Sequence, residues 1–432
     1  MIIIDALITL LSFILLFSNR IVLSFIVVLI SQVLIPQWDV WLHAFLPLCW
    51  ILICLRKYRL NSRSKYYSKL FLIYGLSILL LSFFSDIPIY RSLYSSVTMI
   101  LKYCGLGLML LLTVRRKEEL RLIFIVFGIV TLVSSVYAIF CLITLSNPYT
   151  ELMSNFYPRI SEYTEGFSDD IRGITARITG VFPHPLVLGE YSLLAFCVLM
   201  EMIAMFKKRV LGYFFLLLTV IALVLSGTRS CIVALLVFLF IFLSSYFFRI
   251  KYWAVTLFIV LPIGFWGYSQ LDTNTKELIE ASVFFYDESK SSSISGSSIS
   301  LREEQLDYTL KQDAKVLIMG HGPGYITYSS TINKREYVMA GYESIIFSKV
   351  AEEGVIGLFL FFLLIYFLFH YTVSNSSNMY RRKVLSYYIS YIVCIIMTNI
   401  QGTGHLFFFG CALLMLYKNI PENIESHNIN EY

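Results

Sequence analysis

The sequence has few charged residues. Only 14% of its 432 residues are Asp, Glu, Lys or Arg, whereas a soluble domain has about 25%. Apolar residues make up 58% of the chain and gather in runs of roughly 15–25 residues between short charged segments. Because these runs do not alternate between apolar and polar positions, they are not typical of a transmembrane β-barrel. The sequence therefore predicts an all-α, polytopic transmembrane helical bundle.

Several common kinds of site are also missing. The 8 cysteines lie within or at the edge of apolar runs, so we expect neither a disulfide framework nor a cysteine metal site. The segment GHGPG at 320–324 does not follow the pattern G-x-G-x-x-G and does not predict a nucleotide site. The acidic pair Asp169–Asp170 has the setting of solvated loop residues. We therefore expect no metal and no cofactor, and no basic leader segment marks the start of the chain as a cleaved signal.

The apolar runs predict about 12–13 transmembrane helices in a single integral membrane domain that covers residues 1–432. The first two runs are short for a bilayer crossing, so the N-terminal region is expected to cross two or three times. The expected spans are 2–17, 21–35, 38–55, 70–84, 93–114, 122–146, 186–206, 210–226, 231–247, 252–269, 344–370, 385–400 and 406–417.

Basic loops give the orientation. Clusters of Lys and Arg lie between the expected spans at 56–65, 115–121, 207–209 and 381–383. They fall on one side of the membrane, which the positive-inside rule makes cytoplasmic. Two long polar loops, 147–185 and 270–343, then lie on the outer, periplasm-like face. Ordinary connections are short, so we expect the loop 270–343 to form the catalytic region.

Arginines at the outer face are the candidate ligands for a phosphate group. Arg229 lies in the turn SGTRS (226–230) between two apolar runs, and Arg172 and Arg177 precede the helix expected after Pro185. A charge so close to hydrocarbon is costly and suggests a function, and the planar guanidinium suits bidentate contact with phosphate oxygens. The alternative for Arg229 is a snorkelling side chain that anchors a helix end.

Arg302 is a further candidate. The segment SLREEQ offers a capping box with Ser300 as N-cap, which predicts a helix over about 301–312. Arginine is unfavourable in the first turn of a helix, so an anionic partner is implied. That partner is either a nearby carboxylate, such as Glu304, or an external phosphate.

Two residues are candidates for a general base. Glu343 opens the apolar run at 344–370, where the helix dipole would stabilise its carboxylate or where it would accept a proton at the edge of the bilayer. His321 within GHGPG is either a proton acceptor or a solvated loop residue. Aromatic residues of the outer loops, among them Tyr325 and Tyr342, are expected either to stack on sugars or to form an interfacial belt.

Three stretches together resemble a known family. They are SGTRS with the apolar run after it (226–245), the segment ARITGVFPHPLVLGEYSLLAF, and the run VLIMGHGPGYI followed by GYESIIFSKVAEEGVIGLFLFF. Over about 170–365 the chain resembles the O-antigen ligase and O-antigen polymerase superfamily of bacterial membrane glycosyltransferases, which is GT-C-like in architecture. The resemblance matches Arg229, Arg177 and Arg302 to arginines of that family.

The resemblance implies inverting transfer of a glycan from undecaprenyl pyrophosphate to an acceptor hydroxyl, at the periplasmic face of the bacterial inner membrane. In the ligase branch a histidine stands where this chain has Glu343. That difference favours a polymerase, which joins carrier-linked repeat units into O-antigen or capsule-type polysaccharide. Glu343 is the preferred base and His321 the alternative. A chain-length regulator in the membrane is an expected kind of partner, whereas nucleic acid is not.

Two alternatives remain beside the polymerase. A ligase that transfers the glycan to lipid A-core would share the same arginines. A polysaccharide flippase would also have about a dozen helices, but its charges are expected near the middle of the membrane around a central cavity. In this sequence the charges gather on one face around two long loops, which argues for chemistry at a surface.

Overall fold

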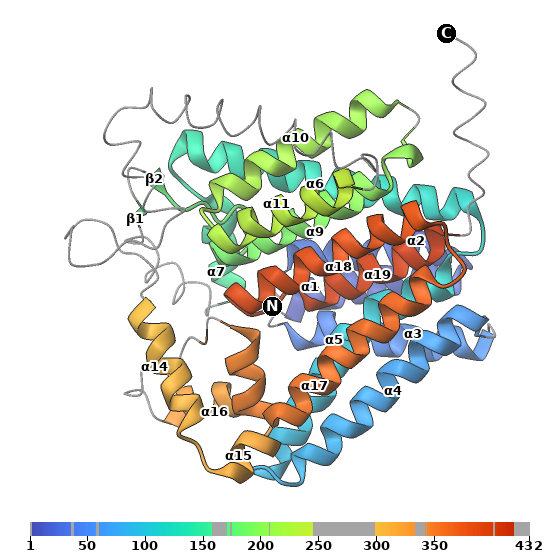
Figure 1. Cartoon of the computed structure of the whole chain (residues 1–432). Coiled ribbons are helices and arrows are strands. Elements are labelled where there is room, and N and C mark those ends of the chain that lie inside the picture. The colour runs from blue at the N-terminus through green and yellow to red at the C-terminus, as the bar shows by residue number, and fades with distance from the viewer. Residues whose placement is uncertain are drawn as a thin grey trace.

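The computed structural model describes residues 2–35, 39–57, 60–157, 171–172, 175–206, 208–244, 299–332, 342, 344–400 and 402–418. Within these ranges helices make up the regular structure, apart from the two-residue antiparallel strands β1 (Ile171–Arg172) and β2 (Thr175–Ala176). Figure 1 shows a bundle of long helices with a group of short helices at one side. The all-α prediction is confirmed.

The elements follow the hydropathy of the sequence closely. Expected span 2–17 is α1, and expected span 344–370 is α17 with bounds Ile345–Val373. The expected span at 252–269 lies outside the described residues, so the number of crossings stays a prediction. The longer helices are α1 (Ile2–Phe17), α2 (Ile21–Leu34), α3 (Leu46–Lys57), α4 (Ser62–Ser82), α5 (Ile89–Thr113), α6 (Lys117–Thr144), α9 (Pro185–Glu201), α10 (Arg209–Leu225), α11 (Arg229–Ser244), α17 (Ile345–Val373), α18 (Asn378–Thr398) and α19 (Gly404–Tyr417).

The helices behave as membrane helices in both length and surface. Among the described elements α5, α6 and α17 are long and apolar enough to cross a bilayer. Large apolar side chains stay exposed at helical spacing on the outside of the bundle, as Leu72, Leu76 and Leu80 do on α4, with exposed fractions of 61%, 53% and 63%. In water such a stripe would be costly, but lipid tails satisfy it. The protein is a multi-pass membrane protein.

Helix α19 forms the centre of the bundle. Its residues from Gly404 to Leu416 are buried, and it packs against α5, α9 and α17. Phe407 stacks on Tyr387 and Tyr391, with ring centroids 5.4 and 4.0 Å apart. Because lipid gives no hydrophobic drive between helices, close packing of this kind is what holds them together.

The described part of the long polar loop 270–343 contains the short helices α14 (Ile299–Leu310), α15 (Ala314–Met319) and α16 (Tyr325–Ile332). The helix expected over 301–312 is therefore confirmed, but the capping box is wrong, because Ser300 lies inside α14 rather than before it. In the first outer loop the chain forms α7 (Pro148–Phe156) before it reaches β1.

Helix α17 is broken at Gly354. This residue has φ 69° and ψ −176°, a conformation that glycine adopts readily and other residues do not. A Cβ atom at Gly354 would lie 2.1 Å from the carbonyl oxygen of Ile318. The backbone at the end of α15 thus passes directly against the break, which fixes the GHGPG turn on α17.

Candidate functional site

Arg177 and the SGTRS turn are in direct contact. The Nε atom of Arg177 donates to the carbonyl oxygen of Ser226 at 3.1 Å, and its Nη2 atom donates to Oγ1 of Thr228 at 3.4 Å. Gly227 lies between these two partners with φ 62° and lets the turn close. The structure therefore brings together two of the predicted motifs.

The start of α9 supports this arginine turn. His184 caps the helix, because its Nδ1 atom accepts from the backbone N–H of Leu186 at 3.0 Å, and Pro185 takes the first helical position. A Cβ atom at Gly189 would lie 2.8 Å from the side-chain oxygens of Ser226 and Thr228. The segment from Arg177 to α9 and the turn between α10 and α11 are thus packed as one unit.

Arg229 is the first residue of α11 and is half-buried. Two arginines therefore lie on one turn, and the helix dipole of α11 adds partial positive charge there. Such an arrangement suits an anionic ligand. Ser230, the next residue, accepts a hydrogen bond from Thr398 at the end of α18.

The turn after α18 connects the arginine turn to the start of α17. Asn399 has φ 71°, accepts from Oγ of Ser348 at 3.0 Å and donates to the carbonyl oxygen of Tyr342 at 3.2 Å. Thr403 in the same turn donates to the buried carboxylate of Glu190 on α9. This turn therefore fixes the backbone at Tyr342, immediately before the predicted base.

His321 is held by a carboxylate that the sequence analysis missed. Its Nδ1 atom lies 2.8 Å from Oδ2 of Asp86, and Nζ of Lys315 lies 3.0 Å from Oδ1 of the same carboxylate. Asp86 lies in the short turn between α4 and α5, and its backbone N–H donates to the carbonyl oxygen of His321 at 2.8 Å. Partial burial raises the pKa of Asp86, but the hydrogen bonds from His321 and Lys315 outweigh burial and lower the pKa below its usual value.

The break of α17 holds the same loop from the other side. The carbonyl oxygens of Ala351 and Glu352, at the end of the first half of α17, accept the N–H groups of His321 and Gly322 at 2.9 and 2.8 Å. The carboxylate of Glu352 also accepts the N–H of Ile326 at 3.2 Å. These bonds satisfy helix-end carbonyls that would otherwise lack partners.

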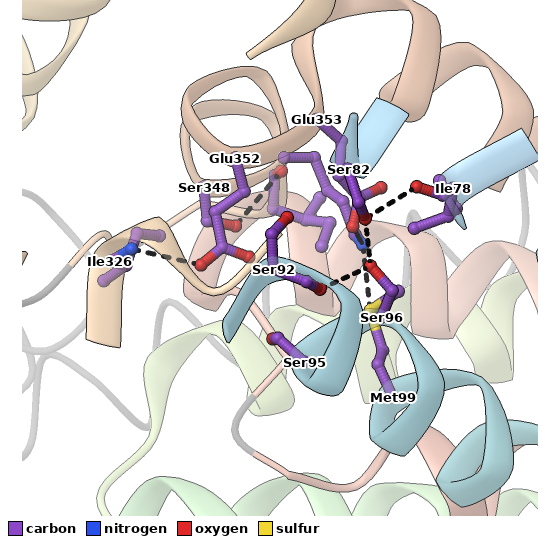
Figure 2. A network of polar contacts seen from close by, with 12 residues as sticks. Ile78, Ser82, Ser92, Ser95, Ser96, Met99, Ile326, Ser348, Glu352 and Glu353 are labelled. Carbon is purple, nitrogen blue, oxygen red and sulfur yellow. Dashed lines mark hydrogen bonds and ion pairs between the residues drawn. The ribbon is translucent and has the colours of Figure 1, made fainter. Parts of the chain in front are cut away.

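Lys349 and Glu353 form a buried ion pair on the same helix. The Nζ atom of Lys349 also lies 3.4 Å from the sulfur of Met99. Figure 2 shows Glu352 and Glu353 beside the serines of α4 and α5. Removal of one partner of a buried ion pair strongly destabilises the folded protein. We therefore interpret this pair as stabilising α17 next to its break at Gly354, and not as groups that react.

The remaining candidates are only partly placed. Arg172 ends β1 and Arg302 lies near the start of α14, but their side chains lie outside the described part of the protein. Glu343 also lies outside the described residues. Within the described ranges no group of three His, Cys, Asp or Glu side chains is placed to hold a metal ion.

Residues 214–362 match the family model Wzy_C, O-antigen ligase. Over these residues the chain is similar to the O-antigen ligase and polymerase superfamily, as the motifs of the sequence predict. The matched O-antigen ligase domain begins inside α10 and ends inside α17, so it contains Arg229 and His321, whereas Arg177 contacts it from the preceding loop. No curated protein matches the chain.

Proposed function

We propose that this protein polymerises undecaprenyl-pyrophosphate-linked oligosaccharide repeat units into an O-antigen or capsule-type polysaccharide, at the periplasmic face of the inner membrane. The observation that carries the proposal is the contact of Arg177 with the turn that precedes Arg229, a turn that lies within the residues matched to the O-antigen ligase family. A pyrophosphate leaving group develops negative charge, and fixed guanidinium groups stabilise that charge.

The proposed reaction is a direct displacement with inversion. A hydroxyl oxygen of the acceptor sugar attacks the anomeric carbon of the donor, and the bond between that carbon and the pyrophosphate oxygen breaks. The hydroxyl proton passes to a base, for which Glu343 is preferred and His321 is the alternative. The electron pair of the broken bond leaves with undecaprenyl pyrophosphate, which Arg177, Arg229, Arg172 and Arg302 are proposed to bind.

A ligase is the second candidate, because the matched family is described as O-antigen ligase. We favour the polymerase because this chain has Glu343 where the ligase branch has histidine. In a polymerase the acceptor is a sugar on another carrier-linked unit, and a membrane protein that regulates chain length is a plausible partner.

Glycan banding in a strain that lacks this chain tests the proposal. The strain is complemented with wild type, Arg229→Ala or Glu343→Ala, and lipopolysaccharide and surface glycans are separated by size. We expect both variants to reach the membrane but to leave a single core-plus-one-unit band. Loss of one fixed charge-stabilising donor in Arg229→Ala slows transfer about 10²–10³-fold, and loss of the general base in Glu343→Ala slows it about 10²–10⁴-fold.

Other band patterns contradict the polymerase in different ways. Loss of every capped band, with carrier-linked polymer accumulating, indicates a ligase. A full ladder from both variants excludes the proposed site. Arg209→Lys, an exposed substitution at the far end of α10, is the matched control and should restore the wild-type ladder.

A further inference from the structure

A second polar centre surrounds His321 and is not explained by the chemistry at the arginine turn. We infer that Asp86 and His321 form a carboxylate–imidazole dyad that binds a hydroxyl group of one sugar of the glycan substrate. The inference rests on the proposed function, because it takes the glycan as the ligand. It assigns His321 to substrate binding and leaves proton transfer to Glu343.

The dyad fixes which nitrogen of His321 accepts a hydrogen bond. An ionised carboxylate only accepts, so the 2.8 Å contact with Asp86 requires Nδ1 to donate. In the neutral imidazole Nε2 then carries the lone pair. Tyr325 stacks on the ring, with centroids 4.1 Å apart and an interplanar angle of 21°, and holds its orientation. His321 is therefore preorganised to accept a hydrogen bond through Nε2.

His321 also borders a small cavity. His321 lines it together with Tyr308 and Gln312 from the outer loop and Tyr342 before α17. Nε2 is buried and has no hydrogen-bond partner among the described residues. A buried acceptor without a partner is unfavourable, so the site is complete only when a ligand or water donates to it.

The chemistry of the walls indicates a neutral, hydroxyl-bearing ligand. Val350 and Ala351 form an apolar side of the cavity, and two tyrosine rings lie on its border. The cavity has a volume of about 10 Å³, room for a group the size of one water molecule. One hydroxyl group of a sugar therefore enters it and donates to Nε2, while the sugar ring stays outside. The neighbouring carboxylate of Asp86 would repel a phosphate group. A sugar of the repeat unit fits these requirements better than the pyrophosphate does.

The position of the dyad favours binding over proton transfer. A general base must lie within hydrogen-bond reach of the attacking hydroxyl. The loop between α15 and α16 lies well away from the start of α11, where the pyrophosphate is proposed to bind (Figure 1). A repeat unit contains several sugars, so a subsite away from the point of transfer contacts another sugar of the same glycan.

Steady-state kinetics of the full-length protein in detergent test the inference. The probe is the carrier-linked repeat unit extracted from the deletion strain, and polymer formation gives kcat and KM. For His321→Gln and Asp86→Asn we expect KM to rise about 10-fold while kcat changes less than about 3-fold. Asp86→Glu keeps the carboxylate and should restore part of the KM. Lys315→Gln, which removes the other partner of Asp86, should leave KM within about 2-fold of wild type.

Other results of these measurements overturn either the subsite or the proposed function. Unchanged KM in both variants, or a loss of kcat with unchanged KM, overturns the subsite. If thermal unfolding shows that His321→Gln does not fold, Tyr308→Leu tests the cavity wall with the same expected rise in KM. Arg229→Ala in the same assay separates the two proposals, because full activity of that variant overturns the proposed function. Loss of activity in Arg229→Ala together with wild-type kinetics in the dyad variants overturns the subsite alone.

Discussion

Arg177 both stabilises the α10–α11 turn and adds a positive charge to it. Its guanidinium reaches a backbone carbonyl and a hydroxyl group on the α10–α11 turn, 3.1 and 3.4 Å away. Hydrogen bonds from a charged donor contribute about 1.5–3 kcal/mol. The same positive charge lies on the turn that precedes Arg229. A single residue therefore links the shape of this turn to its affinity for an anion.

Lysine cannot replace Arg177. Its single ammonium group retains the charge but lacks the planar fork that spans Ser226 and Thr228. We expect Arg177→Lys to lower the rate of polymer formation about 10-fold or more, with a modest decrease in Tm measured in detergent. Arg209→Lys should change neither quantity. Wild-type activity of Arg177→Lys would show that charge alone suffices at this position.

At the scale of elements, the break in α17 determines where the outer loop lies. The first half of the helix starts at Ile345 and ends at the break, and Ser344 caps it because its side chain accepts from the N–H of Ile346 at 3.2 Å. Its last carbonyl groups accept N–H groups of the GHGPG turn instead of continuing the helix. The half-helix and the turn thus form one packed unit that presents His321 to the cavity.

Gly354→Ala should disrupt this unit. The new Cβ atom would meet the carbonyl oxygen of Ile318 at 2.1 Å, and the positive φ adds strain. We expect a loss of at least about 2 kcal/mol in unfolding free energy, measured by denaturation in mixed micelles. Gly128→Ala is the control, since its nearest neighbours are ring atoms 3.3 Å away within a regular helix. That variant should stay within about 1 kcal/mol of wild type.

For the whole molecule, hydropathy predicts the elements but not how they meet. Runs of apolar residues locate α1 and α17 within a residue or two of their N-terminal ends. The pairing of Asp86 with His321, which lie 235 positions apart, leaves no periodic trace in the sequence. Arg177 and Arg229 were identifiable because charge at a membrane boundary is costly. Asp86 was not, because a carboxylate in a short polar turn between two membrane helices is ordinary.

The distribution of exposed and buried apolar residues gives a prediction for the bundle as a whole. Phe407 on α19 is fully buried and stacked, whereas Leu76 on α4 is 53% exposed on the outside. We expect Phe407→Ala to lower the unfolding free energy by about 3–5 kcal/mol, because it leaves a cavity among packed helices. Leu76→Ala should be close to neutral, since lipid fills the space. Equal losses in the two variants would contradict the bundle described here.

The close approach of the backbone near Gly320 to the backbone near Gly354 restricts how the sequence can change in evolution. A Cβ atom at Gly320 would lie 2.4 Å from the backbone carbonyl of Glu352, just as one at Gly354 would meet Ile318. Each glycine thus leaves space for the backbone segment that contains the other glycine. Once two segments have come this close, neither glycine is replaceable while its counterpart keeps the contact. Related chains should therefore keep both glycines or lose both, and a chain with only one of them should have a different outer loop.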